Sequence, residues 1–412
     1  MGKYIKLAWR NTWRNWRRTL IASAAFVLSL ILLLFFQAFL DGFDQAVYGN
    51  LIRLYGGNVL IHTPGYREKS SRLPMLPLEE AEAILAAVRA EPNVRSAARR
   101  INTGGLISNH DASQAVNITA IEPLIEGPVS LAAENITLGR FLTAEDGDNI
   151  VIGQALADHL GVTVGDRVSL LGRRKDDSMR GRTMTVVGIF DLGLGEAEKG
   201  LVFINLPTAQ TLYNLRDQET EIAVILDEVG QEEALIDAIA PQFPNHEVDS
   251  LFTLRPEFRQ AMEMDRIMQW FIGIITLFMA AIGVFNLMLM AVFERTREMG
   301  VLAALGMKRG QVMGLFLLEG ASIGLVGAIL GCAAGWLLVV SLAQQGIGWG
   351  SIEGLEQAGE IYALMGDRLY PHIAPLSVVY YGLAAVVVGA LGAFYPAWQA
   401  SGREPADSLH FE

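Results

Sequence analysis

Four stretches of this chain are almost continuously apolar, and each is long enough to cross a lipid bilayer. Residues 21–40 contain only Ser23, Ser29 and Gln37 as polar positions, and the other stretches are Met268–Phe293, Val312–Leu342 and Leu376–Ala400. Twenty helical residues rise about 30 Å, the thickness of a hydrocarbon core. The pattern predicts four transmembrane helices, which we place at residues 19–41, 268–293, 312–342 and 376–400.

The long segment between the first and second spans has the mixed pattern of a folded domain. Strand–helix–strand patterns occur at residues 58–62, 79–90 and 94–101, and again at 222–227, 231–240 and 246–251. Both helices have apolar residues on one face, as Ile84, Leu85 and Val88 illustrate. We expect these two units to form one membrane-proximal α/β lobe, about residues 42–101 and 211–262.

The middle of this domain, residues 102–210, has the short strands and glycine-rich turns of a β structure. Turn signals lie at Gly104-Gly105, Gly147, Gly161, Gly165 and Gly193. We expect a β-rich distal lobe there. The predicted fold is thus an α-helical membrane protein with four transmembrane helices and a large α+β extracytoplasmic domain, residues 42–267, inserted between helices 1 and 2.

Charge predicts the orientation of the chain. Residues 41–266 hold 20 Lys+Arg and 34 Asp+Glu, a net charge of −14 in a chain whose net charge is −12. Basic residues instead cluster before the first span and between the second and third. Because cytoplasmic loops attract Lys and Arg, residues 1–18, the turn 294–311 and the tail 401–412 are expected inside. The acidic domain and the loop 343–375 are then outside.

The first apolar run is expected to be a retained anchor. It is longer than the core of a signal peptide, and no small-x-small cleavage site follows it. Cys332 is the only cysteine, so an intrachain disulfide is impossible. The exported domain must therefore be stabilised by its own packing.

The segment before the first span is a cationic amphipathic helix by its spacing. The tryptophans repeat at i, i+4, i+7, and the arginines repeat with the same spacing one position later. The two sets therefore lie about 100° apart around the helix. Such a helix is expected to lie on the inner leaflet, although a simple positively charged anchor explains it equally well. The residues are Trp9, Arg10, Trp13, Arg14, Trp16 and Arg17.

The third span carries a stripe of glycines with spacings of 4, 3, 4 and 4. Small residues let helix backbones approach closely in lipid, where no hydrophobic force brings helices together. The partner could be another span of this chain or a second copy. The stripe consists of Gly320, Gly324, Gly327, Gly331 and Gly335.

Two of the polar residues inside the predicted spans are candidates for a specific role. Asn286 is expected to form an interhelical hydrogen bond rather than to bind a transported ligand. Glu319 lies near the cytoplasmic end of the third span, where an unpaired carboxylate costs about 2.5–3.5 kcal/mol on insertion scales. We expect it to pair with a basic residue, with proton relay as the alternative.

Signatures of enzyme chemistry are missing from the sequence. There is no G-x-x-x-x-G-K-[ST] loop, no H-E-x-x-H or Cys/His set for zinc, and no G-x-S-x-G turn. We expect no catalytic residues, no metal site, no cofactor and no nucleic-acid partner on this chain. Any ATP hydrolysis would belong to a separate subunit.

The turn after the second span is predicted to contain a short amphipathic helix that ends at Gly306. Its apolar face is too small for a core and indicates either a groove on a partner or the lipid surface. The segment consists of Glu294, Arg295, Thr296, Arg297, Glu298, Met299, Gly300, Val301, Leu302, Leu305 and Gly306.

This turn resembles the coupling helix of the FtsX-like, MacB-type ABC transporter permeases, whose pattern is E-R-T-R-E-[IM]-G-[IV]-L-x-A-L-G. The tail from Tyr395 to Leu409 and the opening Leu7-Ala-Trp-Arg-Asn are similar to the same family. The resemblance implies two permease chains, identical or different, with two separate ATPase chains that bind ATP and magnesium. It also implies that the permease lies in a bacterial inner membrane and that its coupling helix docks on the ATPase. Closure of the ATPase dimer would then move the periplasmic lobes.

Within the family, residues 56–66, 188–195 and 203–210 resemble the lipoprotein-releasing (LolC/LolE-like) permeases. Those proteins can carry a proline-containing hairpin that holds a periplasmic carrier, whereas this chain has a shorter basic segment with Arg173, Arg174, Lys175, Arg180 and Arg182. That segment is either a solvated loop or a contact for an acidic partner. We expect extraction or transfer of a lipoprotein or another amphiphile. The alternatives are tripartite efflux of small molecules or peptides, and non-transporting signal transduction to a periplasmic hydrolase.

Overall fold

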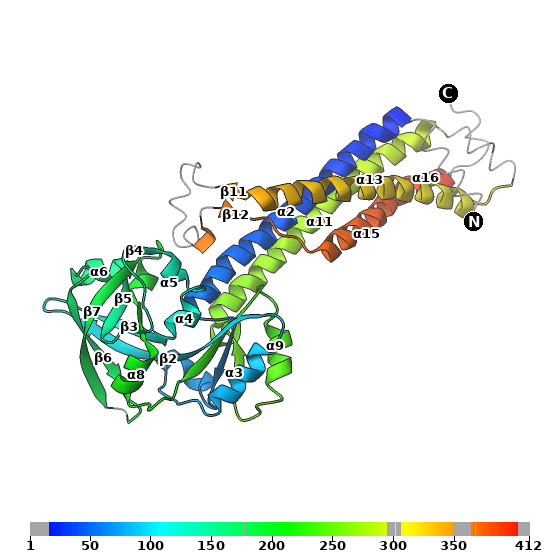
Figure 1. Ribbon diagram of the computed structural model, residues 1–412. Coiled ribbons are helices and arrows are strands. Elements are labelled where there is room, and N and C mark those ends of the chain that lie inside the picture. Colours follow the sequence, from blue (N-terminus) through cyan, green and yellow to red (C-terminus); the bar gives the residue numbers. More distant parts are fainter. Residues whose placement is uncertain are drawn as a thin grey trace. The chain divides into compact units, whose positions relative to one another are not determined.

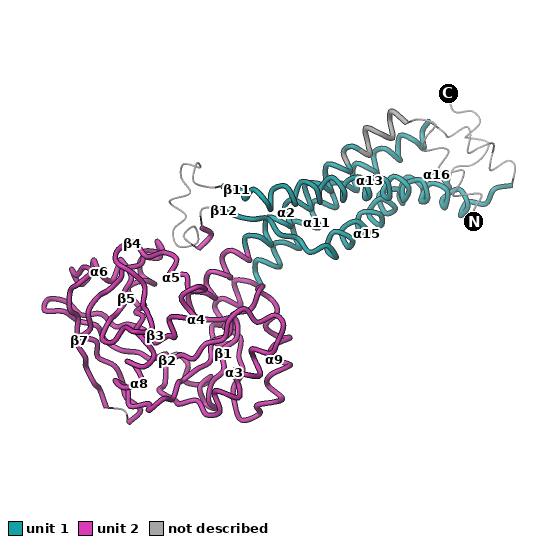
Figure 2. The backbone as a smooth tube through the Cα atoms, in the orientation of Figure 1, with its two compact units in different colours: residues 1–43, 263–348, 368–412 teal, residues 44–262, 349–367 magenta. Residues whose placement is uncertain are grey.

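The computed structural model describes residues 16–176, 178–294, 301, 306–348, 364–366 and 368–402. The chain forms two compact units (Figure 2). Residues 1–43, 263–348 and 368–412 make up the helical unit, and residues 44–262 and 349–367 make up the sheet unit. The helix–domain–helix order confirms the predicted fold class, four long apolar helices with an α+β domain between the first and the second.

The long helices are α2 (Trp16–Tyr55), α11 (Pro256–Glu294), α13 (Arg309–Gln345) and α15 (Pro375–Gly392) (Figure 1). A shorter helix, α16 (Phe394–Gly402), follows α15. Within the described residues, four helices are long and apolar enough to cross a membrane, counting α15 and α16 as one. The fourth is broken at Ala393 because Pro396 has no N–H to donate to the carbonyl four residues earlier.

Helices α2 and α11 are longer than the spans predicted from hydropathy, and each contributes residues to both units. Nothing between Leu40 and Tyr55 breaks α2, which ends where Gly56 adopts a φ of 112°. At the start of α11, Pro256 takes the first helical position, where a missing N–H costs nothing. The polar ends of both helices therefore belong to the sheet unit.

In the described part of the sheet unit, ten strands form one sheet in the order β10-β1-β9-β2-β3-β8-β5-β7-β4, with β6 pairing to β2 and β7. Its strands are β1 (Val59–His62), β2 (Val94–Ser108), β3 (Ser113–Ile121), β4 (Ile136–Gly139), β5 (Asn149–Gly153), β6 (Arg167–Arg173), β7 (Met179–Phe190), β8 (Leu201–Asn205), β9 (Glu221–Leu226) and β10 (Glu247–Ser250).

The sheet unit also contains short helices. They are η1 (Arg67–Arg72), α3 (Ala81–Arg89), α4 (Pro123–Glu126), α5 (Leu131–Glu134), α6 (Gln154–Leu160), α7 (Glu196–Lys199), α8 (Leu206–Tyr213), α9 (Glu232–Ile239) and α10 (Leu251–Leu254). A two-residue pair, β11 (Ile347–Gly348) with β12 (Arg368–Leu369), follows α13.

Two separate hydrophobic clusters of described residues include residues of the sheet. One lies under α3 and α9 and includes Ile84, Val224 and Ile239. The other is built mainly from residues 101–215, with Ile118 and Tyr213 fully buried. Strand β2 takes part in both, because its first half pairs with β9 and its second half with β3 and β6.

The turn predicted at Gly104-Gly105 is wrong. Both residues lie inside β2, which continues to Ser108. A Cβ at position 105 would come within 2.4 Å of the Leu171 carbonyl oxygen and of Ile118 Cδ1. Glycine is therefore needed there for close approach between strands rather than for a turn. Gly161, Gly165 and Gly193 do have positive φ values, as turns require.

Candidate functional site

The five glycines of α13 are buried and face other helices of the same chain. A Cβ on Gly327 would lie 2.4 Å from Phe26, and one on Gly331 would lie 2.9 Å from Leu30, both on α2. A Cβ on Gly335 would lie 2.8 Å from Leu34, also on α2. Helix α2 thus packs against the stripe in the second half of α13.

The first half of the stripe faces the fourth span. A Cβ on Gly320 would lie 2.4 Å from the Cβ of Ala393, and one on Gly324 would lie 3.2 Å from the Cα of Val386. Gly389 of α15 reciprocates, since its own Cβ would lie 2.9 Å from the Cα of Gly324. The glycines of α13 therefore let side chains of α2 and the backbone of α15 come into close contact with it.

The two intramembrane polar residues of the sequence differ in their surroundings. Glu319 is buried, with 4% of its surface exposed. Asn286 lies on the exposed side of α11. Its expected interhelical hydrogen bond therefore stays a prediction.

A crevice of about 280 Å³ opens between α2, α11 and α15. On α11 its wall changes from Arg266 and Gln269 to Ile274 and Leu277, over eleven residues or about 16 Å of helix. The Gln37 side chain is buried and donates from Nε2 to the Gln269 carbonyl oxygen at 3.3 Å. The remaining lining residues are Trp270, Gly273, Tyr380, Tyr381 and Ala384.

Sequence reasoning noted Gln37 only as an interruption of the first span and missed the crevice. Arg266 and Gln269 lie at the edge of a predicted span, where polar residues are ordinary. A weak signal was available in the small residue Gly273, which leaves space beside Gln37: a Cβ there would lie 3.6 Å from Nε2.

Most of the predicted coupling segment lies outside the described residues, namely 295–300 and 302–305. At its ends, Glu294 closes α11, and Gly306 has a φ of 92°, in the left-handed region that favours glycine. Of the predicted surface helix, residues 1–15 also lie outside the described part, and α2 begins at Trp16.

The basic segment forms the end of the hairpin between β6 and β7. Arg173, Lys175 and Arg180 are exposed. Arg182 forms an ion pair with Asp148 at 2.7 Å, and Arg174 lies 3.7 Å from Asp176. Part of the positive charge of the hairpin is therefore balanced locally.

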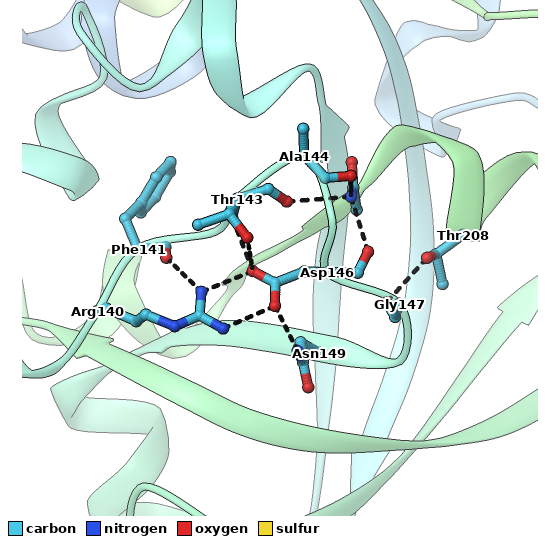
Figure 3. Close-up of polar contacts among 9 residues, drawn as sticks. Arg140, Phe141, Thr143, Ala144, Asp146, Gly147, Asn149 and Thr208 are labelled. Carbon is cyan, nitrogen blue, oxygen red and sulfur yellow. Dashed lines mark hydrogen bonds and ion pairs between the residues drawn. The ribbon is translucent and has the colours of Figure 1, made fainter.

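Next to β7, one strand of this hairpin, the loop between β4 and β5 is held together by one carboxylate (Figure 3). Asp146 accepts two hydrogen bonds from the Arg140 guanidinium, both at 2.7 Å, and others from Thr143 and Asn149. These bonds, led by that from Arg140, hold the pKa of the Asp146 carboxyl well below its usual range despite its burial. Asn205 adds three hydrogen bonds to carbonyl oxygens of the same loop.

Models of known protein families match residues in both units of the chain. The family model "MacB-like periplasmic core domain" matches residues 19–242, and "FtsX-like permease C-terminal" matches residues 270–405. The lipoprotein-releasing system transmembrane protein LolC of Xylella fastidiosa is 26% identical over 351 residues, 82% of this chain and 82% of that protein.

A second relative is the macrolide export ATP-binding/permease protein MacB of Hyphomonas neptunium. It is 24% identical over 84% of this chain but only 54% of its own length. The crystal structure of the periplasmic region of MacB from Actinobacillus actinomycetemcomitans covers 53% of this chain and 98% of that structure, with 14% identity and a TM-score of 0.35.

The periplasmic core model alone spans more than half of the chain, and the permease model covers the helices that follow. These matches agree with the resemblance of the turn after the second span and of the C-terminal tail. The chain belongs to the FtsX-like permeases with a MacB-like periplasmic core domain, and it is a multi-pass permease subunit of the ABC type.

Proposed function

We propose that this permease extracts a lipoprotein or another amphiphile from the membrane and passes it to the periplasm. The observation that carries the proposal is the crevice between α2, α11 and α15. Its wall offers a guanidinium and two amides at one end and aliphatic side chains at the other. An amphiphile has the same division between a polar head and an apolar chain.

The surface around the crevice suits a ligand that arrives from lipid. Trp270, Phe271 and Ile274 of α11 each expose more than half of their surface, and Tyr380 of α15 does so too. Aromatic residues of this kind are frequent at the boundary between headgroups and acyl chains. A lipid-linked ligand could enter sideways, without crossing the bilayer.

The relatives support this substrate class. The LolC relative, whose name refers to lipoprotein release, is matched over 82% of its length. The MacB relative, whose name includes an ATP-binding part, is matched over only 54%. In this proposal the permease acts together with a separate ATPase, in an assembly of two ATPase copies and two permease chains.

The crevice can be tested by filling it. Gly273→Leu adds a side chain toward Gln37, whereas Gly283→Leu on the same helix meets open space. With the partner ATPase in proteoliposomes, transfer of a fluorescent triacylated lipoprotein should fall at least tenfold for Gly273→Leu only. Wild-type transfer by that variant would refute the proposal.

The energy input can be tested at the turn after α11. Leu302→Asp together with Leu305→Asp should abolish permease-stimulated ATP hydrolysis, because a charged face no longer suits an apolar groove. Leu124→Asp, at a leucine of the sheet unit that is 79% exposed, is the matched control and should leave hydrolysis unchanged. Normal stimulation in the double variant would contradict docking through this segment.

The second candidate is efflux of small molecules through a periplasmic adaptor. The match of the MacB-like core model to residues 19–242 favours it. In that case the exposed basic side chains Arg173, Lys175 and Arg180 would contact an acidic adaptor. Copurification of an adaptor without any lipoprotein would favour efflux over lipoprotein transfer.

A further inference from the structure

The first half of β2 is paired with a neighbouring strand on one side only. Residues 94–100 pair with β9, whereas residues 101–108 pair with β3 and β6. Strand β3 ends at Ile121, and the chain then turns into α4, which has Pro123 at its start. Among the described strands, none lies along the other side of residues 94–100. We call this open side the β2 edge.

Two side chains show which backbone groups point toward the β2 edge. The Arg99 N–H donates to Glu122 Oε2 at 3.0 Å. The Ala97 carbonyl oxygen accepts from Arg89 Nη2 at 2.8 Å. Neither partner belongs to β9, and the N–H and C=O of one strand residue point to the same side. The Ala97 N–H therefore points toward the β2 edge as well.

A bulge adds further unpaired backbone groups at Arg95. The register with β9 shifts between Val94 and Ser96, which leaves Arg95 as the extra residue without an opposite partner. In the described part of the chain, neither the Arg95 backbone nor the Ala97 N–H forms a backbone hydrogen bond outside the strand ladder. A carbonyl oxygen accepts two hydrogen bonds, so that of Ala97 can take a second donor. An added strand would therefore find donors and acceptors here.

A groove of about 590 Å³ runs along the β2 edge. Residues 94–97 form one wall. The other wall consists of Ile125 of α4 and of Pro128 and Val129, which precede α5. Exposed strand edges in native proteins are normally blocked or covered. Here the edge adjoins open space with an apolar wall against which the side chains of an added strand could pack.

The charge of the groove is opposite to that of the rest of the domain. Residues 41–266 hold 20 Lys+Arg and 34 Asp+Glu. Arg89 and Arg95 both line the groove, both are exposed, and no described lining residue is acidic. Arg89 uses one N–H group on Ala97, and a guanidinium has five. The groove therefore complements an extended partner with negative charge.

We propose that the β2 edge and its groove bind an extended, acidic peptide segment of a partner protein by strand addition. The backbone of the peptide would pair with Arg95 and Ala97, and its apolar side chains would pack against Ile125 and Val129. Its carboxylates would lie near the guanidinium groups of Arg89 and Arg95. In strand addition the backbone hydrogen bonds give affinity, and side-chain contacts give specificity. Such binding does not require the crevice between α2, α11 and α15 to hold an amphiphile.

The test is fluorescence anisotropy with the full chain in detergent micelles. The probe is a fluorescein-labelled peptide of alternating valine and glutamate, kept at nanomolar concentration. One control peptide alternates valine and lysine, and another is the acidic peptide N-methylated throughout, which cannot donate ladder hydrogen bonds. Arg95→Glu reverses the charge of the groove. Arg167→Glu, at an exposed arginine at the start of β6, is the matched control.

The acidic peptide should bind the wild type and the Arg167→Glu variant equally, and Arg95→Glu about tenfold more weakly. Arg89→Gln, which keeps a donor for the Ala97 carbonyl, should weaken binding about threefold, the effect of one exposed ion pair. The lysine peptide and the N-methylated peptide should bind the wild type at least tenfold more weakly than the acidic peptide.

Three results would overturn the proposal. The first is no binding of the acidic peptide at micromolar protein. The second is equal affinity for the three peptides, or equal affinity of Arg95→Glu and Arg167→Glu for the acidic one. The third is loss of peptide binding as the wild type self-associates through the β2 edge, because a second copy of the chain would then be the occupant.

Discussion

The two units of this protein place their large apolar side chains differently. In the sheet unit, Phe190, Tyr213 and Ile118 are completely buried. In the helical unit, Phe271, Phe278 and Leu337 expose 65%, 66% and 68% of their surfaces. Water drives apolar side chains of the sheet unit inward, whereas lipid accepts them at the surface of the helices. Burial therefore stabilises one unit, and close backbone approach stabilises the other.

The largest effect should come from removing volume in the sheet unit. Ile118→Ala should destabilise it by about 2–5 kcal/mol, because the fully buried side chain leaves a cavity that its neighbours fill only in part. Leu124→Ala, at a leucine that is 79% exposed, is the control and should change little. Hydrogen exchange of β3 and β5 in the full chain measures both. Similar exchange rates in the two variants would contradict stabilisation by burial.

The helical unit should respond to added volume instead. Gly327→Leu should cost about 1–3 kcal/mol, because its Cβ would meet the Phe26 ring at 2.4 Å. Gly314→Leu on the same helix meets open space and serves as the control. Thermal unfolding and size-exclusion chromatography in micelles report the difference. A Gly327→Leu variant as stable as Gly314→Leu would disprove the role of close approach.

A smaller, pH-dependent effect should appear at Glu219 of the sheet unit. Burial raises the pKa of this carboxyl to about 7; Arg99 opposes the shift, and Glu82 and Glu122 add to it. The folded state thus binds the proton more tightly than the unfolded state. Stability from this group is fully present below the unfolded pKa of 4.5 and is lost as the pH rises through 7.

Glu219→Gln should therefore be more stable than the wild type at pH 8 and nearly equal to it below pH 4.5. Thermal unfolding of both proteins across this pH range measures the difference. A constant difference between the two proteins would show that burial of the charge is not the cause.

The smallest effect should come from the basic hairpin. Arg182→Gln removes the ion pair with Asp148, in which the two side chains are 37% and 43% exposed. Such surface pairs contribute about 0.2–1 kcal/mol, and salt weakens them. Unfolding at low and high salt should show a small loss that disappears with salt. A loss above 2 kcal/mol would mean that the hairpin is part of the core.

Local patterns predicted most of the elements. The helix expected at residues 79–90 is α3, Ala81–Arg89, and the strand expected at 222–227 is β9, Glu221–Leu226. The helix shows apolar residues at helical spacing and the strand is a short apolar run, and a sequence displays both patterns directly. The turn expected at Gly104-Gly105 is absent because a glycine required for close strand approach, as Gly105 is, looks the same in sequence as one in a turn.

The sequence by itself determined four apolar helices, the inserted domain and the family, because each depends on the length or order of residues along the chain. Tertiary structure alone decided which helices the glycines of α13 contact and how Gln37, Arg266 and Tyr380 come to share one crevice. It also placed His62, Glu221 and Arg100 in one buried row. These residues are far apart in the chain, and only pairing of strands and packing of helices brings their charges and surfaces together.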